Sequence, residues 1–553
     1  MKLVVVGGVA AGMSAAARAR RLDEHADIIV FERSEFVSFA NCGLPYHIGG
    51  TIADRKQLLL QTPESLAGSL NLDVRTGTEV VAIDRTAKQV RVREAASGKT
   101  YTETYDKLIL APGAAPLRPP LPGIDHPRIC VLRNIADMDH IQNLITQGAK
   151  AATIIGAGYI GVEMAENLRE RGLKVDLVEM ADQVMPPLDH EMTHPLENTL
   201  REHGVTLHLG TAAAAFTETA GRLCTELANG TMLRADLVIL SVGVKPDVKL
   251  ARDAGLTIGP RGGIQVDSHM QTNDPCIYAA GDAVEVTDLA LCCPALIPLA
   301  GPANRQGRIA GENVCGRTTV YTTTQGTAIV KVFEMTGGCT GANEKSLKRA
   351  GIPYRKIYLH PPNHARYYPG SAPMHIKVMF TPDEGKLLGA QVVGYNGVDK
   401  TIDVLATAMR SGLTVHDLES LELAYAPPYG SAKDPANMVG FIGNNLLQGD
   451  LEPWYSEEYP DQTNNAMILD VRTPTEYDTW HIPGAVNIPL DKLRSSLDSL
   501  PRDKTILAYC RVGFRSYFAY RMLKQHKYNV KTLMGGIFTF RKYHRVDISP
   551  VAS

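Results

Sequence analysis

An excess of charge of one sign and a long apolar run are both missing from this sequence. Lys and Arg together number 57 and Asp and Glu 59, which gives a formal net charge of −2. Such a balance gives no reason to expect nucleic acid or an anionic membrane as a partner. No apolar stretch reaches the ~20 residues that a membrane-spanning helix needs. We therefore expect no membrane insertion and a cytoplasmic location.

Paired cysteines are missing as well. The nine cysteines are scattered along the chain, and no two of them form a CxxC motif. This pattern argues against the disulfide framework of small secreted proteins and against a zinc ribbon, so we expect no metal site. Most of these cysteines are expected to be buried as small hydrophobic residues. Cys42 and Cys510 stand apart because of the motifs around them.

At 553 residues the chain has room for three or four domains. Its first 32 residues have the βαβ pattern of a dinucleotide-binding fold. An apolar strand at 2–6 leads into a glycine turn, a helix of small residues follows, and a strand at 28–31 ends in Glu32. Small residues permit a tight turn, the helix N-terminus favours a pyrophosphate, and the acid binds ribose hydroxyls. Val9 replaces the middle glycine of the usual motif.

A second and complete copy of this pattern begins at residue 153. The strand at 153–155 enters the turn Gly156-Ala157-Gly158-Tyr159-Ile160-Gly161, and the next strand, at 175–178, ends in Glu179. Two such folds indicate two dinucleotide cofactors. Glu179 would accept hydrogen bonds from a ribose diol and repel a 2′-phosphate, and no arginine follows it directly. The sequence therefore favours NADH, with NADPH possible.

A third motif indicates the order of the two cofactors. Residues 272–283 form a strand and a glycine turn that resemble the second FAD motif of the two-dinucleotide flavoprotein reductases, in which the aspartate, here Asp282, contacts the flavin's ribityl–pyrophosphate region. Residues 105–113 and 241–246 resemble the two crossings between the domains of that family. The resemblance implies an FAD domain at 1–112 and 246–323 with an NAD(P)H domain inserted at 113–245.

The residues expected to bind these cofactors are Gly7, Ala10, Ala11, Gly12, Glu32, Arg33, Val80, Ala111, Pro112, Gly113, Gly156, Gly158, Tyr159, Ile160, Gly161, Glu179, Gly243, Gly281 and Asp282.

Cys42 lies in the segment SFANCGLPY, after the first ribose-binding acid. Most disulfide reductases of this architecture have a CxxxxC pair here, but this chain has His47 in place of the second cysteine. A single thiol cannot close an internal disulfide, but it can form a mixed disulfide with a small thiol or be oxidised to a sulfenic acid. A flavin contact and a helix N-terminus would lower its pKa and favour the thiolate.

This segment and the turn GGVAAGMSAAARARR together resemble the coenzyme A–disulfide reductases, a single-cysteine branch of the pyridine nucleotide–disulfide oxidoreductases, over roughly residues 1–445. NADH oxidases and peroxidases also use one cysteine. They place a histidine in the first glycine turn, where this chain has Ala10, so the coenzyme A relationship is favoured.

The resemblance also implies a substrate site and a homodimer. Residues 324–445 resemble the dimerisation domain, whose tyrosines, here Tyr367 and Tyr425, reach across the dimer toward the partner's cysteine. Arginines on one face of the first helix suit the phosphates of coenzyme A. The residues expected to contact the substrate in this part of the chain are Ser14, Arg18, Arg21, Ser38, Asn41, Asn304 and Lys433.

The C-terminal part contains a second distinctive cysteine. Residues 446–461 have the composition of a linker, and 462–553 resemble a single rhodanese domain through DVR, HIPGA and the loop CRVGFR. Cys510 begins this strand-to-helix loop, where backbone N–H groups stabilise anions and Arg511 and Arg515 add positive charge. We therefore expect a thiolate near neutral pH, and the resemblance implies that it carries sulfane sulfur as a persulfide.

The expected fold class is α/β: two dinucleotide-binding (Rossmann-like) domains, an α+β dimerisation domain and an α/β rhodanese domain. The expected protein is an FAD-dependent NAD(P)H oxidoreductase that reduces coenzyme A persulfide, polysulfide or coenzyme A disulfide through Cys42, while Cys510 handles sulfane sulfur. Two alternatives remain. One is an NADH oxidase or peroxidase that uses a Cys42 sulfenic acid, and the other is a sulfurtransferase or persulfide carrier with a non-catalytic flavoprotein part.

Overall fold

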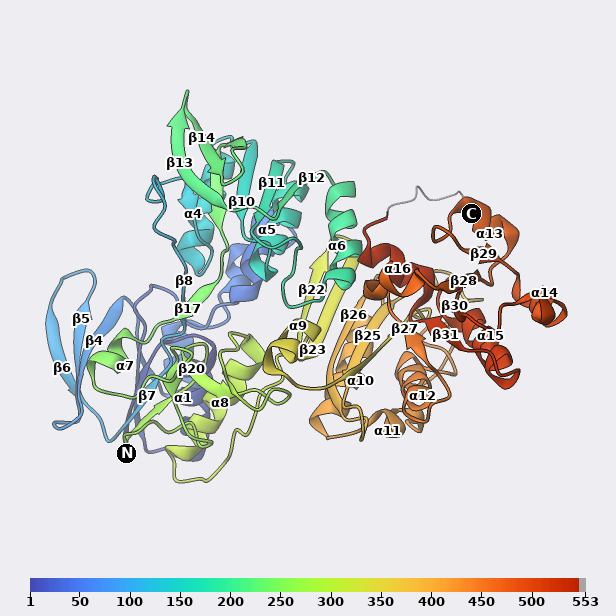
Figure 1. Cartoon of the computed structure of the whole chain (residues 1–553). Helices are drawn as coiled ribbons and strands as arrows, with labels where there is room; N and C mark the ends of the chain where they lie inside the picture. Colours follow the sequence, from blue (N-terminus) through green and yellow to red (C-terminus); the bar gives the residue numbers. More distant parts are fainter. Residues whose placement is uncertain (547–553) are drawn as a thin grey trace. The chain divides into compact units, whose positions relative to one another are not determined.

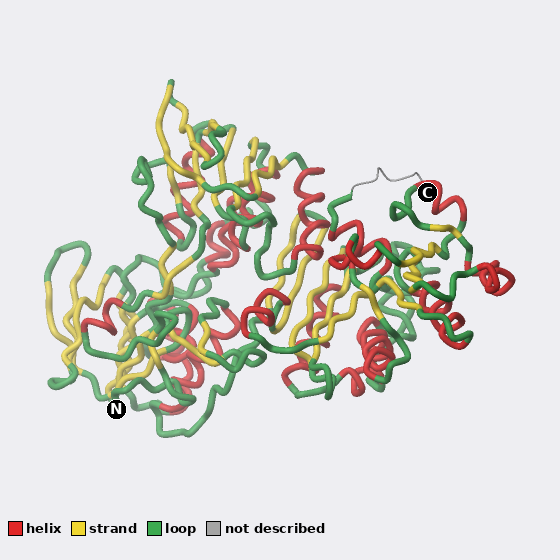
Figure 2. The backbone as a smooth tube through the Cα atoms, viewed as in Figure 1, coloured by secondary structure: helices red, strands yellow, loops and turns green. Residues whose placement is uncertain are grey.

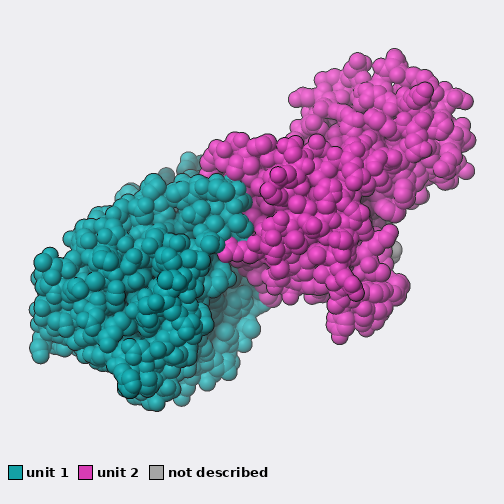
Figure 3. Space-filling model, turned by 90° about the horizontal axis from the view of Figure 1, so that it is seen from below, with its two compact units in different colours: residues 1–182, 203–326 teal, residues 183–202, 327–553 magenta. Residues whose placement is uncertain are grey.

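The computed structural model describes residues 1–546 (Figure 1). The chain forms two compact units (Figure 3). One comprises residues 1–182 and 203–326, and the other comprises residues 183–202 and the chain from 327 onward. The first unit contains both helices and strands, and many of its strands follow one another with no helix between them (Figure 2). None of the helices in residues 1–546 combines the length and the apolar character required to cross a bilayer.

The first unit begins with a parallel sheet in the order β19-β7-β1-β2-β3. Its strands are β1 (Lys2–Val6), β2 (Asp27–Phe31), β3 (Asp73–Arg75), β7 (Lys107–Leu110) and β19 (Ile277–Ala279). Four of the five residues of β1 are buried, as expected for a strand in the middle of a parallel sheet. Because β19 comes so late in the chain, this sheet is assembled from two separated segments.

Helices α1 (Ala10–Leu22) and α8 (Ala300–Asn313) pack closely on each other. The contact depends on glycine, since a Cβ on Gly307 would lie 2.1 Å from the Ala11 carbonyl oxygen and one on Gly311 would lie 2.5 Å from that of Ala15. This close packing brings the first glycine turn, at the start of α1, near the FAD-type motif at 272–283.

A second parallel sheet has the order β12-β11-β10-β16-β9. Its strands are β9 (Ile129–Cys130), β10 (Ala151–Ile155), β11 (Lys174–Glu179), β12 (Val205–Leu209) and β16 (Leu237–Leu240), with helices α4 (Ile135–Thr146) and α5 (Tyr159–Glu170). The first crossing segment expected from the sequence, 105–113, leads directly into β8 (Ala114–Pro116). This strand pairs antiparallel with β17 (Val244–Pro246), which is the end of the second expected crossing.

Smaller elements complete this unit. They are η1 (Asn41–Gly43), α2 (Leu44–Gly49), η2 (Arg55–Leu58), α3 (Pro63–Leu70), β4 (Thr78–Asp84), β5 (Gln89–Glu94), β6 (Thr100–Thr104), β13 (Ala213–Thr219), β14 (Arg222–Leu227), β15 (Met232–Ala235), α7 (Lys249–Asp253), β18 (Ile264–Gln265), β20 (Val284–Thr287) and β21 (Pro294–Ala295).

The second unit contains an antiparallel sheet in the order β22-β23-β26-β25-β24. Its strands are β22 (Ala328–Val332), β23 (Met335–Gly341), β24 (Arg355–Leu359), β25 (His375–Phe380) and β26 (Leu387–Gly394), and its helices are α6 (His190–Glu202), α9 (Glu344–Ala350), α10 (Val398–Arg410), α11 (Val415–Glu419) and α12 (Pro435–Leu447). Every residue of β25 and β26 is buried. Helix α6 comes from the range expected for the NAD(P)H domain, yet it packs on this sheet, with Leu196 against Gly337.

The C-terminal part of the second unit contains a parallel sheet in the order β27-β31-β30-β28-β29. Its strands are β27 (Pro453–Trp454), β28 (Ala466–Asp470), β29 (Val486–Asn487), β30 (Thr505–Tyr509) and β31 (Val530–Leu533), and its helices are η3 (Ser456–Glu458), η4 (Asp461–Thr463), α13 (Pro474–Thr479), α14 (Leu490–Leu493), η5 (Arg494–Ser499), α15 (Phe514–Gln525) and α16 (Gly536–Tyr543). Alternate residues of β30 enter two cores: Ile506 and Ala508 lie in one, Leu507 and Tyr509 in the other.

The sequence-based assignment of a linker at 446–461 is wrong in its second half. Pro453 and Trp454 form β27, which pairs with β31 at the edge of this sheet. The Trp454 side chain is fully buried, and its Nε1 donates a hydrogen bond to the Ala508 carbonyl. Burial of one large aromatic side chain fixes a segment whose composition resembles a linker. The last seven residues of the range 462–553 lie outside the described residues.

Within this unit, the C-terminal part packs directly on β24 and β25. The Tyr455 hydroxyl donates to the Lys356 carbonyl at 2.9 Å, and the Lys356 ammonium pairs with Glu457. His360 hydrogen-bonds Thr539 of α16 at 2.9 Å. The contact is therefore built from buried polar groups as well as aromatic rings.

Candidate active sites

The first glycine turn forms a cradle of backbone groups closed by an acid. The Glu32 carboxylate accepts hydrogen bonds from the backbone N–H groups of Gly8 and Ser34, both at 2.8 Å. A Cβ on Gly12 would lie 1.8 Å from the Gly7 carbonyl oxygen, so only glycine allows α1 to begin this close to β1. The space that side chains would fill is thus left to backbone N–H groups, which suit a pyrophosphate.

The second glycine turn repeats this arrangement. The Glu179 carboxylate accepts from the backbone N–H groups of Ala157 and Ala181, at 2.7 and 2.9 Å. A Cβ on Gly161 would lie 1.9 Å from the Gly156 carbonyl oxygen. The same two contacts at two places 147 positions apart reflect one construction used twice, which is what two dinucleotide sites require.

The FAD-type motif after β19 contributes a turn and an acid. The Gly281 backbone N–H donates to the Gln306 side chain of α8 at 2.9 Å. Burial raises the pKa of Asp282, although Arg133 opposes this shift. The Arg133 guanidinium also donates to the Pro112 carbonyl at 3.1 Å, just after β7. The segments expected to cross between the cofactor domains are thus tied to the turn that presents Asp282.

The remaining expected cofactor residues take the following places. Ala10 and Ala11 start α1, Tyr159 and Ile160 start α5, Ala111 and Gly113 flank Pro112, Gly158 is the N-cap residue of α5, Gly243 precedes β17, Val80 is buried on β4, and Arg33 forms an exposed ion pair with Asp247.

Cys42 lies in η1 and is solvent-exposed. The sequence predicted a lowered pKa for its thiol, but the chain raises this pKa. Partial burial of the sulfur is the largest cause, and the carboxylates of Glu163 and Asp282 add to it. The helix that follows, α2, has only six residues, so its dipole does little to compensate. The sequence did not indicate this opposing effect, because the two acids come from distant parts of the chain, and the lowering expected from a flavin contact stays a prediction.

Glu163 was missed by the sequence analysis. It lies on α5, the helix of the second glycine turn, and α5 packs against α2 next to Cys42. Burial and the neighbouring Glu166 raise the pKa of Glu163 to about 7. Burial and the same carboxylates raise the pKa of Tyr46 to about 12. The one signal in the sequence is its position, because Glu163 follows Gly156 by seven residues, on the helix that begins at the second glycine turn.

Part of the expected substrate site is assembled by α1 and α8. The Ser14 hydroxyl donates to the Asn304 side chain at 2.6 Å, so two predicted contacts that are 290 residues apart in sequence meet. Arg18 is bound to Glu312 of α8, with a shortest nitrogen–oxygen distance of 2.5 Å. Arg21 is exposed, as is Asn41 beside Cys42, and Ser38 lies nearby at a positive φ of 47°.

Two predicted tyrosines meet in the second unit. The hydroxyl groups of Tyr367 and Tyr425 lie 3.0 Å apart and hydrogen-bond each other. Both side chains are exposed, at 76% and 48% of their surface. Lys433 is also exposed, two residues before α12. The structure thus gathers phenol groups on this unit's surface, where they can donate protons.

Cys510 follows β30 at the start of a loop of backbone donors. Its side chain is buried, and the Gly513 N–H donates to its Sγ at 3.2 Å. The carbonyl of Cys510 accepts from Ile537 at 2.9 Å, which ties the loop to α16. Arg511 lies over the Phe538 ring, 4.9 Å from its centroid. The backbone of the loop is therefore fixed by α16, while the Gly513 N–H donates to the sulfur.

Arg515 does not act as the free positive charge that the sequence indicated. Its guanidinium forms a bidentate pair with Glu476, at 2.6 and 2.7 Å. The hydrogen bond from Arg515 lowers the pKa of Glu476 to about 2. Glu476 therefore keeps its negative charge at neutral pH and offsets the arginine beside Cys510.

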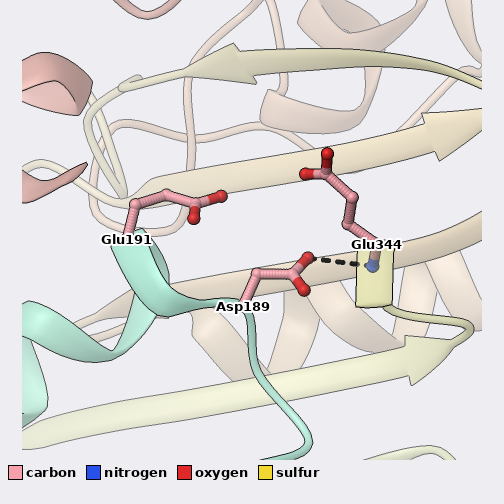
Figure 4. Close-up of side chains that lie close together, drawn as sticks. All are labelled: Asp189, Glu191 and Glu344. Carbon is pink, nitrogen blue, oxygen red and sulfur yellow. Dashed lines mark hydrogen bonds between the residues drawn. The ribbon is translucent and has the colours of Figure 1, made fainter. Parts of the chain in front are cut away.

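Three buried carboxylates converge elsewhere in the second unit. Asp189, on the loop just before α6, and Glu191, in the first turn of α6, face Glu344 of α9 (Figure 4). The Lys377 ammonium lies 2.9, 2.6 and 2.6 Å from their respective oxygens. Burial raises the pKa of Glu191, but Lys377 outweighs this effect, so the pKa is lowered overall. The cluster is an internal salt bridge centred on an ammonium group.

Comparison with known proteins defines the class to which this fold and these sites belong. The chain belongs to the pyridine nucleotide-disulphide oxidoreductase family, which matches residues 1–307. The dimerisation domain of that family matches residues 327–436, and the rhodanese-like domain matches residues 454–543. The expected fold class is confirmed. Family membership implies FAD and NAD(P)H, and the two backbone cradles fit both.

Individual relatives narrow the class. The chain is 47% identical to a reduced Bacillus anthracis protein designated CoADR-RHD, with 98% of each chain covered and a TM-score of 0.96. It is 38% identical to an NAD-dependent persulfide reductase from A. fulgidus, with 98% and 100% covered and a TM-score of 0.92. Coenzyme A disulfide reductase from Staphylococcus aureus (strain JH9) is 37% identical over 80% of this chain and 99% of its own. The expected sulfur-directed oxidoreductase with a rhodanese domain is confirmed, and the comparisons favour it over both alternatives.

Proposed function

We propose that this protein uses NADH to reduce the persulfide or the disulfide of coenzyme A at Cys42, and that Cys510 supplies the sulfane sulfur. The observation that carries the proposal is the presence, in one chain, of an exposed cysteine, Cys42, beside the expected flavin site and a second cysteine, Cys510, whose sulfur accepts a backbone N–H hydrogen bond at the start of a strand-to-helix loop. The names of the related coenzyme A disulfide reductase and persulfide reductase support the substrate class.

The proposed reaction begins at Cys510. Its thiolate attacks a terminal sulfur of a polysulfide, the sulfur–sulfur bond of the donor breaks, and a persulfide forms on Cys510. The N–H of Gly513 stabilises the negative sulfur. The persulfide then passes its outer sulfur to the thiol of coenzyme A.

The second stage takes place at Cys42. Its sulfur attacks the coenzyme A sulfur of the persulfide, a mixed disulfide forms, and hydrosulfide leaves. Bound FAD would supply the two electrons of the nicotinamide that reduce this disulfide, and coenzyme A would then be released from Cys42. Overall, coenzyme A persulfide, NADH and a proton give coenzyme A, hydrogen sulfide and NAD⁺. Coenzyme A disulfide would enter the same cycle with a thiol as the leaving group.

The chain's own groups have defined tasks in this proposal. Ser14, Asn304 and Arg21 bind coenzyme A along α1 and α8, with Ser38 and Asn41 near its thiol end. The protein acts as a homodimer, in which the paired tyrosines Tyr367 and Tyr425 protonate leaving thiolates and Lys433 holds a phosphate. Glu179 selects NADH by binding the ribose diol.

Anaerobic consumption of NADH by the holoenzyme tests the proposal. Preformed coenzyme A persulfide is expected to be reduced by the wild type and by Cys510→Ser, and not by Cys42→Ser. With polysulfide and catalytic coenzyme A, Cys510→Ser is expected to lose most of the rate. Equal rates of the wild type and Cys510→Ser with every donor would refute the role of Cys510. NADH loss matched by oxygen uptake alone would refute the whole proposal.

A further inference from the structure

The C-terminal part of the second unit contains a groove that the proposed function does not use. It runs between α14 and α15 and has a volume of about 780 Å³, within the range of small-molecule sites. Arg515 lies at one end and His526 at the other. Because α15 rises about 1.5 Å per residue, the groove is roughly 15 Å long, enough for an extended ligand.

The charged side chains of the groove favour an anion. Arg494, Arg515 and Arg521 line it together with one carboxylate, Asp491, and Arg515 offers a ligand only the N–H donors that its pair with Glu476 does not use. Within the described residues, the Arg494 guanidinium is exposed and makes no hydrogen bond or ion pair. Arg521 pairs with Asp450, but a guanidinium has five N–H donors and can bind a phosphate at the same time.

Aromatic rings at the same groove favour a nucleobase. Phe518 lines the groove and is 47% exposed, and Phe514, one turn earlier, is 60% exposed. Their ring centroids are 4.8 Å apart. Two exposed phenylalanines side by side on a small folded part mark a binding surface. Bases stack on such rings without sequence preference.

The groove is connected to the reactive sulfur. Arg515 lines the groove from the first turn of α15, five residues after Cys510, and its guanidinium is held there by Glu476. Leu490 and Met522 provide apolar lining along the groove. These features match a ligand with three parts: phosphates for the arginines, a base for Phe518, and a long thiol-ended arm for the apolar lining that leads toward Cys510.

We infer that the groove is a second site for coenzyme A, in which the arginines and Phe518 hold the adenosine-phosphate end while the thiol reaches Cys510. The identity of the ligand rests on the proposed function, in which coenzyme A accepts sulfur from Cys510. In that step the coenzyme A sulfur bonds to the outer sulfur of the Cys510 persulfide, the bond between that sulfur and Sγ breaks, and its electron pair remains on Cys510 as the thiolate. The thiol proton ends on the transferred sulfur, and no oxidant is needed.

Sulfur transfer without NADH provides the kinetic test. The full-length holoenzyme carrying Cys42→Ser is charged with polysulfide, and the formation of acceptor persulfide is followed with coenzyme A or with pantetheine, which lacks the nucleotide. Arg494→Ala and Phe518→Ala are each expected to raise the KM for coenzyme A about tenfold, the loss of about 1.4 kcal/mol, with kcat unchanged. The KM for pantetheine is expected to stay the same.

Lys504→Ala removes an exposed charge of the same domain outside the groove and serves as the control. Unchanged KM values for coenzyme A in the Arg494 and Phe518 variants, beside an active wild type, would overturn the groove while leaving the proposed function intact. Absence of coenzyme A persulfide from the Cys42→Ser enzyme would overturn the proposed transfer instead.

Calorimetry with coenzyme A separates these cases without any turnover. The full-length Cys42→Ser holoenzyme is expected to bind two molecules per chain, and the Arg494→Ala/Phe518→Ala variant one. One molecule in both proteins would overturn the second site whatever the transfer rates are. A surface that binds another protein through the two phenylalanines would give that result.

Discussion

The reactivity of Cys42 is set by residues that are distant in sequence. Glu163 of α5 and Asp282 after β19 both oppose ionisation of its thiol. With its pKa near 7, Glu163 itself changes charge at physiological pH. Cys42 is therefore coupled to a group that turns neutral as the pH falls, and the thiolate is least disfavoured by Glu163 below pH 7.

Replacing Glu163 by Gln is expected to lower the pKa of Cys42, because the carboxylate charge that disfavours the thiolate is removed. The rate of iodoacetamide alkylation, measured against pH on the reduced holoenzyme, reports this pKa. The profiles of wild type and variant are expected to differ above pH 7 and to converge below it.

Glu170→Gln removes an exposed acid from the same helix and is expected to leave the profile unchanged. A Glu163→Gln profile that matches the wild type, or that moves to higher pH, would contradict the coupling.

The choice of nicotinamide cofactor is also a matter of single residues. Glu179 closes the second turn and is followed by the exposed Met180. Glu179→Ala combined with Met180→Arg is expected to raise the ratio of kcat/KM for NADPH over NADH at least tenfold, because repulsion of the 2′-phosphate is replaced by attraction. Steady-state rates with both cofactors measure this. Met232→Arg adds the same charge on β15 and should not change the ratio.

At the scale of elements, local sequence predicted most of the framework and little of the interplay between sites. The strands at 2–6 and 153–155 were located from apolar runs that end at glycine. Strand β27 was not predicted, because two residues are too few to show an apolar periodicity. The strand is recognised only from its pairing with β31 and the burial of Trp454. The electrostatic effect of Glu163 on Cys42 and the Arg515–Glu476 ion pair depend on packing between elements, which no local pattern contains.

The start of α1 depends on one glycine. Gly12→Ala would bring a Cβ to 1.8 Å from the Gly7 carbonyl, so the helix must shift away from the turn that we assign to FAD. We expect flavin loss, measured as the ratio of flavin to protein absorbance, and a lower melting temperature. Gly68→Ala, on α3 with open space around it, is the control and is expected to stabilise slightly, by up to ~1 kcal/mol. Full flavin content in Gly12→Ala would show that the turn tolerates the shift.

At the scale of the whole molecule, stability depends on a few buried charges in the second unit. Lys377 is completely buried and balances Asp189, Glu191 and Glu344. Removing one member of such a cluster leaves charges that neither water nor a partner compensates. The cost is therefore far larger than that of an ion pair at the surface.

Lys377→Met is expected to destabilise the second unit by about 3–5 kcal/mol, because three carboxylates lose their shared partner. Lys386→Met breaks an exposed pair with Glu384 and is expected to cost less than about 1 kcal/mol. Calorimetric melting of both variants compares the two effects. Equal melting temperatures would show that the buried carboxylates find other partners or take up protons.

The contact between the antiparallel sheet and the C-terminal part limits how the two can be separated or recombined. Lys356 and His360 lie on one side of it, and Tyr455, Glu457 and Thr539 lie on the other. Domains joined only by a flexible linker can be separated or exchanged without exposing buried surface. The C-terminal part of this chain cannot, because it packs on β24. Truncation before residue 446 would expose Lys356, which would lose one of its two carboxylate partners, and His360, which is buried in the intact chain. A graft of the C-terminal part onto another dimerisation domain therefore has to transfer the residues on both sides of this contact.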